Sequence, residues 1–160
     1  MCRTRQRAFT LIELLVTLAV LGICAVLIAA HAAPDERTRL QLEAERLAHL
    51  LDLAANEARL TATPISWTAD AGGYRFLLYT QDAGWSEPRA GSALRTRALA
   101  PGVTLVDVQV YDARRNGALH LVFSPSAPAP IFSIGLAAGS ERLRVVGSAI
   151  GEVRIERGGA

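Results

Sequence analysis

Cysteine is nearly absent from this 160-residue sequence: Cys2 and Cys24 are its two cysteines, and both lie near the amino terminus. The rest of the chain therefore cannot form a disulfide, a thiolate metal site or a cysteine nucleophile. Histidine is almost as scarce, and His31, His49 and His120 lack the spacing of metal ligands. We expect no metal site and no cofactor, and a fold held together by its core alone.

An excess of charge of one sign is also missing. The chain has 17 basic and 15 acidic residues, and three of the arginines precede the first apolar run. The remainder is near neutral, so no bulk attraction to nucleic acid is expected. The serines do not form a GxSxG motif, and Asp70, Asp82 and Asp107 have no partner that the sequence identifies. We therefore predict that the chain is not an enzyme.

What the chain does have is a long apolar run directly after a short basic leader. As a helix at about 1.5 Å per residue, Phe9 to Ala30 would reach roughly 33 Å, and a hydrocarbon core is about 30 Å thick. Arg3, Arg5 and Arg7 favour a cytoplasmic amino terminus. The sequence predicts a single transmembrane helix over residues 9–33, with everything after it on the other side of the membrane.

One carboxylate, that of Glu13, lies inside this apolar run. An ionised carboxylate in a membrane helix costs on the order of 2.5 to 3.5 kcal/mol by insertion scales. Glu13 therefore needs a proton or a cation. A cut between Ala8 and Phe9 would create an amine one helical turn before Glu13, and a neighbouring copy could supply that amine equally well.

The stretch AFTLIELLV, from Ala8 to Val16, resembles the class III signal of type IV pilins and type II secretion pseudopilins. The resemblance implies a leader over residues 1–8 and cleavage by a prepilin peptidase between Ala8 and Phe9. It also implies N-methylation of Phe9 and a role for Glu13 as the assembly carboxylate. Ala8 stands where that family mostly has glycine. The implied location is the inner membrane, with a periplasmic carboxyl-terminal domain.

Two other interpretations of this run remain open. A basic start, an apolar stretch and Ala30-His31-Ala32 are also features of a secretory signal peptide with its cleavage site. An ordinary signal anchor, in which Glu13 is protonated or reaches the membrane surface, is the other. Neither interpretation accounts for the FTLIE sequence.

Residues 34–62 have the pattern of an amphipathic helix that continues the anchor after a bend or break near Pro34. Apolar residues recur at steps of four and three and form one stripe. They are Leu40, Ala44, Leu47, Leu51, Ala54 and Ala58. His49 falls off this stripe and is interpreted as a surface residue.

From residue 63 to residue 160 the pattern changes to short runs with a period of two, which predicts an antiparallel β domain. The predicted strands are 65–68, 74–79, 103–111, 119–123, 131–136, 143–146 and 152–156. Residues 80–98 are predicted to be a polar loop that contains Trp85, and Asn116-Gly117 favours a hairpin turn. Trp85 would either contact a partner or anchor its own loop. The predicted fold class is α+β.

Several short sequence segments of the β region are similar to segments of the H-type minor pseudopilins of type II secretion. They are Gly72-Gly73-Tyr74, Trp85, Leu99–Val103 and Gly151–Ile155. The resemblance implies a pilin-like fold, with a long helix packed on an antiparallel β-sandwich. It implies a low-copy subunit at or near the tip of the periplasmic pseudopilus that helps export folded proteins. The implied partners are other pseudopilins, major and minor, and the inner-membrane assembly platform.

The alternative is a minor pilin of a type IV pilus, involved in pilus assembly or DNA uptake. Four arginines near the carboxyl terminus could contact phosphates: Arg142, Arg144, Arg154 and Arg157. Three glutamates among them favour a solvated surface instead: Glu141, Glu152 and Glu156. Nucleic acid is therefore not the expected partner.

Overall fold

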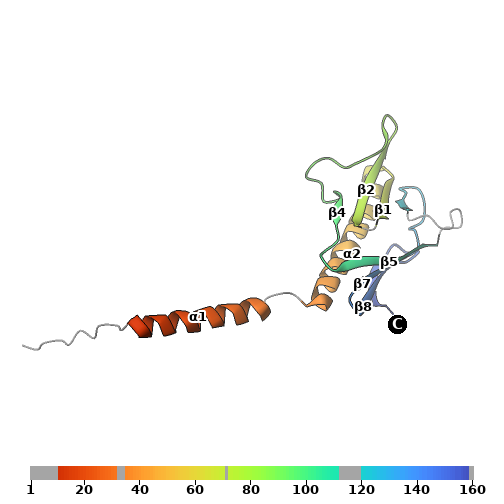
Figure 1. Ribbon diagram of the computed structural model, residues 1–160. Helices are drawn as coiled ribbons and strands as arrows, with labels where there is room; N and C mark the ends of the chain where they lie inside the picture. Colours follow the sequence, from red (N-terminus) through yellow and green to blue (C-terminus); the bar gives the residue numbers. More distant parts are fainter. Residues whose placement is uncertain (1–10, 32–34, 71, 112–119, 159–160) are drawn as a thin grey trace, which may run out of the picture. The chain divides into compact units, whose positions relative to one another are not determined.

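The computed structural model describes residues 11–31, 35–70, 72–111 and 120–158 (Figure 1). The chain divides into two compact units, residues 1–35 and residues 36–160. Each unit is described by itself below.

The first unit contains the helix α1, Leu11–His31. Its sequence is apolar on all sides, and the hydroxyl group of Thr17 is hydrogen-bonded within the helix. The Thr17 Oγ1 donates to the carbonyl oxygens of Glu13, at 3.0 Å, and Leu14, at 2.9 Å. In the part of the chain that the structure describes, no helix combines the length and apolar character needed to cross a membrane.

The second unit begins with the helix α2, Glu36–Thr61. Its buried face contains the whole predicted stripe, together with Glu43, Leu50 and Ala55. His49 is exposed, as predicted. The helix ends because Ala62 adopts a left-handed conformation, with φ of 52°, and the Thr63 amide donates back to the Ala58 carbonyl at 3.2 Å.

The first sheet consists of five antiparallel strands. They are β1 Ile65–Asp70, β2 Gly73–Thr80, β3 Gly84–Ser86, β4 Arg97–Ala98 and β6 His120–Phe123. The order is β3-β2-β1-β6, and β4 pairs with another part of β2. The prediction of a polar loop over residues 80–98 holds only in part, because this segment also contains β3 and β4, both paired with β2. Strands of two and three residues are too short to show a periodic pattern in the sequence.

The second sheet has four antiparallel strands in the order β5-β7-β8-β9. They are β5 Val103–Val110, β7 Phe132–Ala138, β8 Glu141–Gly147 and β9 Val153–Arg157. The β5 strand has a bulge between Leu105 and Asp107, whereas β8 and β9 pair without interruption. The predicted turn at Asn116-Gly117 lies outside the described residues.

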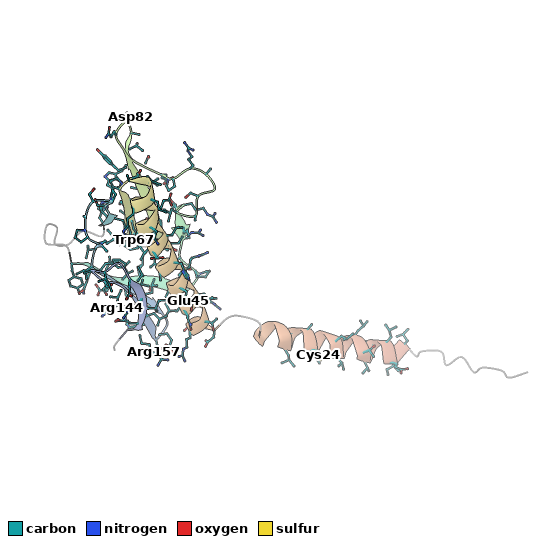
Figure 2. The ribbon with its side chains drawn as sticks, turned by 180° about the vertical axis from the view of Figure 1, so that it is seen from behind. Cys24, Glu45, Trp67, Asp82, Arg144 and Arg157 are labelled. Carbon is teal, nitrogen blue, oxygen red and sulfur yellow. The ribbon has the colours of Figure 1, made fainter. Side chains whose placement is uncertain are left out.

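The core lies where α2 packs against both sheets (Figure 1). Leu47 and Leu51 of the helix are fully buried, and so is Trp67 of β1 (Figure 2). The two sheets meet through an edge-to-face contact of Phe123 and Phe132, whose ring centroids are 6.5 Å apart. The predicted α+β class, a helix packed on an antiparallel β domain, is confirmed.

Two glycines allow contacts that any side chain would block. A Cβ on Gly147 would lie 2.1 Å from the ring of Phe132, which covers this glycine from the neighbouring strand. A Cβ on Gly73 would lie 2.2 Å from the Arg97 carbonyl oxygen, where β4 approaches β2. These glycines are required by packing rather than by an unusual backbone conformation.

Replacing Leu51 by alanine should lower the free energy of unfolding by about 2 to 5 kcal/mol, because the change leaves a cavity between α2 and the sheets. Leu53→Ala is the matched control, because Leu53 lies on the same helix and is 38% exposed. Denaturant unfolding of the full chain in detergent, followed by circular dichroism, measures both. Equal losses for the two variants would contradict the proposed core.

Candidate functional site

The predicted processing and assembly residues belong to the amino-terminal unit. Ala8 and Phe9 lie outside the described residues. Glu13 lies in the first turn of α1, where the helix dipole favours a negative charge, and its side chain is exposed. The large apolar side chains of α1 are exposed as well. They are Leu11, Ile12, Leu14, Leu15, Val16, Leu18, Val20, Leu21, Ile23, Val26 and Leu27. So large an apolar surface marks a site of association with a membrane or with other apolar surfaces.

Trp85 lies on β3, directly opposite Tyr79 of β2. Its ring contacts Tyr79 edge-to-face, at 5.4 Å between centroids, and contacts His120 of β6 in the same way at 5.9 Å. The His120 Nδ1 is 3.2 Å from the Ser66 Oγ. Trp85 therefore anchors its segment on the outer face of the first sheet, but it remains 40% exposed. The contact with His120, which is far away in the sequence, could not be predicted from residue spacing.

The four carboxyl-terminal arginines do not share one face of the second sheet. Arg157 pairs with Leu143 and points toward α2, whereas Arg144 pairs with Glu156 on the outer face. Arg142 and Arg154 alternate with inward-facing residues and share that outer face with Arg144. Arg154 forms an ion pair with Glu152. The outer face therefore carries charges of both signs.

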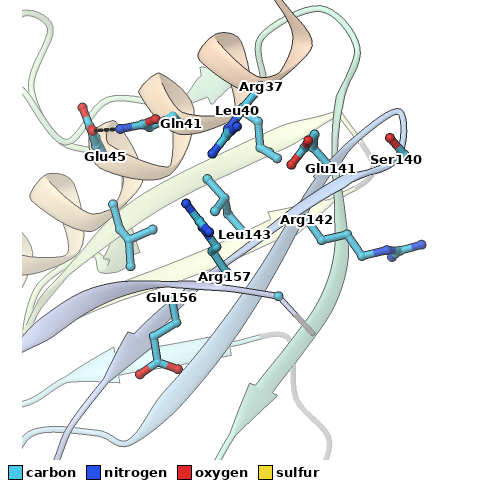
Figure 3. A pocket seen from close by; sticks show the side chains of 12 residues that line it. Arg37, Leu40, Gln41, Glu45, Ser140, Glu141, Arg142, Leu143, Glu156 and Arg157 are labelled. Atoms are coloured by element: carbon cyan, nitrogen blue, oxygen red, sulfur yellow. Dashed lines mark hydrogen bonds between the residues drawn. The ribbon is translucent and has the colours of Figure 1, made fainter. Parts of the chain in front are cut away.

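A pocket of about 480 Å³ lies between the first turns of α2, the start of β8 and the end of β9 (Figure 3). Leu40 and Leu143 form its apolar lining, and Arg37, Glu45 and Arg157 are among its charged residues. A second hollow, of about 540 Å³, continues along α2 and β9. Glu45 and Ile155 line both. In the described part of the chain, no three histidine, cysteine or acidic side chains come together as metal ligands.

Sequence reasoning missed a buried carboxylate on α2. Glu43 is 3% exposed, and its Oε2 is 3.0 Å from the Arg46 Nη1. The Tyr74 hydroxyl donates to the Glu43 Oε1 at 3.4 Å. Burial and the nearby Glu43 charge raise the pKa of Tyr74 above the usual range of tyrosine. One signal was available, because Glu43 lies four residues before Leu47 and thus beside the apolar stripe.

An amino-terminal apolar helix with one carboxylate, followed by a helix packed on an antiparallel β domain, defines a pilin-like subunit. Two family models match the chain in agreement with this class. The prokaryotic N-terminal methylation motif matches residues 3–29, and the type II transport protein GspH matches residues 43–151. The chain belongs to the GspH family of type II transport proteins. The prediction of an H-type pseudopilin of type II secretion is confirmed.

Solved structures agree with this family in their fold. A structure of the minor pseudopilin EpsH from the type 2 secretion system of Vibrio cholerae has a TM-score of 0.62 at 20% identity, covering 74% of this chain and 97% of that one. A crystal structure of the same pseudopilin has a TM-score of 0.63 at 20% identity, covering 76% and 96%. The solution structure of Escherichia coli GspH has a TM-score of 0.56 at 16% identity, covering 75% and 89%. A comparison with curated proteins found no match.

The buried Tyr74 predicts a loss of stability at alkaline pH. Tyrosine in the unfolded chain loses its proton near pH 10, whereas folded Tyr74 keeps its proton to higher pH. The free energy of unfolding should therefore fall as the pH rises above about 10, and Tyr74→Phe should reduce this dependence. Urea unfolding at a series of pH values measures it, with Tyr79→Phe as the exposed control. An unchanged pH dependence in Tyr74→Phe would contradict the burial of this hydroxyl.

Proposed function

We propose that this minor pseudopilin is a low-copy subunit at or near the tip of the periplasmic pseudopilus, where it helps export folded proteins. The proposal rests on one observation: two family models match different parts of the same chain. A prepilin-type methylation motif covers residues 3–29, and a GspH domain covers residues 43–151. The EpsH structures with the same fold are described as minor pseudopilins of a type 2 secretion system.

Residues 9–33 would anchor the subunit in the inner membrane, with the amino terminus in the cytoplasm and the β domain in the periplasm. The exposed apolar side chains of α1 support this placement, because water is a poor surrounding for them. A prepilin peptidase would cleave between Ala8 and Phe9 and methylate the new amine. The methylation motif and the family imply this processing and assembly with other pseudopilins.

Assembly would proceed by docking within the membrane. The amine of Phe9 and the carboxylate of Glu13, from neighbouring subunits, would neutralise each other where neither charge is solvated by water. This pairing would select the register, and the apolar surface of α1 would supply the packing. The amino-terminal leader, residues 1–8, would be removed before docking. The inner-membrane assembly platform is the expected site of this step.

We propose a structural role without catalysis for the β domain. The GspH family consists of structural pseudopilin subunits. Trp85 and Tyr79 present an exposed aromatic surface on the outer face of the first sheet. Such a surface suits contact with another protein, since aromatic residues are enriched at interfaces.

A minor pilin that takes up DNA is the second candidate. Arg142, Arg144 and Arg154 share one face, which favours phosphate contact, but Glu156 lies among them on that face. A clean deletion of the gene distinguishes the two candidates in one culture. Loss of exoenzyme secretion with normal uptake of added DNA, restored by the intact gene, supports the pseudopilin. Loss of uptake with normal secretion would favour the pilin.

Replacing Glu13 by valine should allow membrane insertion and cleavage but impair assembly. We expect incorporation into the pseudopilus to fall by roughly tenfold, since a charge-assisted contact contributes about 1.5 to 3 kcal/mol. Mass spectrometry of the membrane fraction reports cleavage before Phe9, and immunodetection of sheared pseudopili reports incorporation. Glu57→Val, a carboxylate of α2 outside the motif, is the control. Normal incorporation of Glu13→Val would contradict the proposed pairing.

A further inference from the structure

The strand β9 is the longest regular edge strand among the described residues. In the first sheet, the edge strands β3, β4 and β6 have three, two and four residues. In the second sheet, β5 forms one edge and carries a bulge, a device that hinders pairing with another strand. The opposite edge, β9, has five residues in unbroken register with β8. It thus presents a regular template for one more strand.

The hydrogen bonds of the hairpin show which backbone groups of β9 face outward. The Ser148 amide donates to the Glu152 carbonyl, and the Gly158 amide donates to the Arg142 carbonyl. Glu152 and Gly158 therefore belong to hydrogen-bonded pairs with β8, and hydrogen-bonded residues alternate along an antiparallel strand. The intervening residues Val153, Ile155 and Arg157 direct their amides and carbonyls away from β8.

The sequence of β9, VRIER, is complementary to itself when two copies run antiparallel. Pairing centred on Ile155 places Arg154 of each copy opposite Glu156 of the other. These pairs of opposite charge would occupy positions without backbone hydrogen bonds, where side chains approach closely. Val153 would lie opposite Arg157, and the outward backbone groups of both strands would all be paired.

The inner side of β9 has room for such a neighbour. Ile155 is 36% exposed, although it pairs with the buried Val145 and faces α2. The two hollows beside α2, of about 480 and 540 Å³, both reach Ile155. Side chains of a second strand would enter these hollows and cover the exposed part of Ile155.

We propose that β9 is a self-association edge, at which two copies of this chain pair antiparallel about Ile155 and join their four-stranded sheets. A strand pair of this length buries less area than a stable dimer needs, so the association is weak and reversible. It does not depend on the proposed place in the pseudopilus. The same edge cannot pair with another protein at the same time, so the dimer occupies the edge until it dissociates.

Oxidative cross-linking of the purified full chain in detergent tests the pairing, in a background of Cys2→Ser and Cys24→Ser. Ile155→Cys should form a disulfide-linked dimer, because directly opposite residues have Cα atoms about 5.5 Å apart, within the range of a disulfide. Thr104→Cys, an exposed position on the bulged edge strand β5, is the matched control and should remain monomeric.

Charge variants of Ile155→Cys separate pairing from damage to the fold. Arg154→Glu alone, or Glu156→Arg alone, places like charges opposite each other and should lower the dimer fraction about fivefold or more. An equimolar mixture of these two variants restores both attractive pairs, so mixed dimers should form as readily as dimers of the parent. If a variant had lost its fold, mixing it with the other variant would not restore the dimer fraction.

No dimer of Ile155→Cys, or equal cross-linking of Thr104→Cys, would overturn the proposal. The proposal would also be overturned if the two charge variants formed dimers as readily in separate samples as in the mixture. If Ile155→Cys cross-links in membranes to a different pseudopilin that carries a cysteine on an edge strand of its own, and never to itself, the edge binds another subunit and the proposed occupant is wrong.

Discussion

The packing of one face of α2 against two separate sheets is the interaction on which the rest of the β domain depends. Leu47 and Leu51 are fully buried between the helix and the strands. In the described residues the sheets also meet at the Phe123–Phe132 contact, and α2 contacts strands of both sheets. Because no cysteine lies beyond residue 24, this apolar packing has no covalent support. The helix therefore fixes the relation of both sheets, and with it the relation of the aromatic surface to the charged one.

Much of this fold follows from patterns that sequence alone contains. The stripe from Leu40 to Ala58 predicted the buried face of α2, and the alternating runs predicted β1, β2, β5, β6, β7, β8 and β9 within a few residues. The short strands β3 and β4 were missed because two or three residues carry no period. Their positions depend on contacts with β2, and the close approach at Gly73 is visible only once the chain is folded.

The candidate functional residues also divide into those that the sequence alone identifies and those that only the folded chain brings together. The amino-terminal motif is local in sequence, so Ala8, Phe9 and Glu13 could be named from the chain alone, and a family model matches the segment that contains them. The residues that form each surface of the β domain are far apart in the sequence. Which arginines share a face depends on the register of β8 and β9, and the contact of Trp85 with His120 joins β3 to β6, which have β2 and β1 between them in the sheet. Glu43 was missed because a carboxylate beside an apolar stripe is usually solvated, whereas here it is buried beside Tyr74 and paired with Arg46, whose side chain reaches it from the surface.

The two tryptophans of the chain lie in contrasting surroundings. Trp67 is fully buried in the core, whereas Trp85 is partly open to solvent on the outer face of the first sheet. A soluble quencher such as iodide reaches only the second indole while the domain is folded. The fluorescence of this chain therefore contains two separable signals, one that reports the integrity of the core and one that reports whether the aromatic surface is covered.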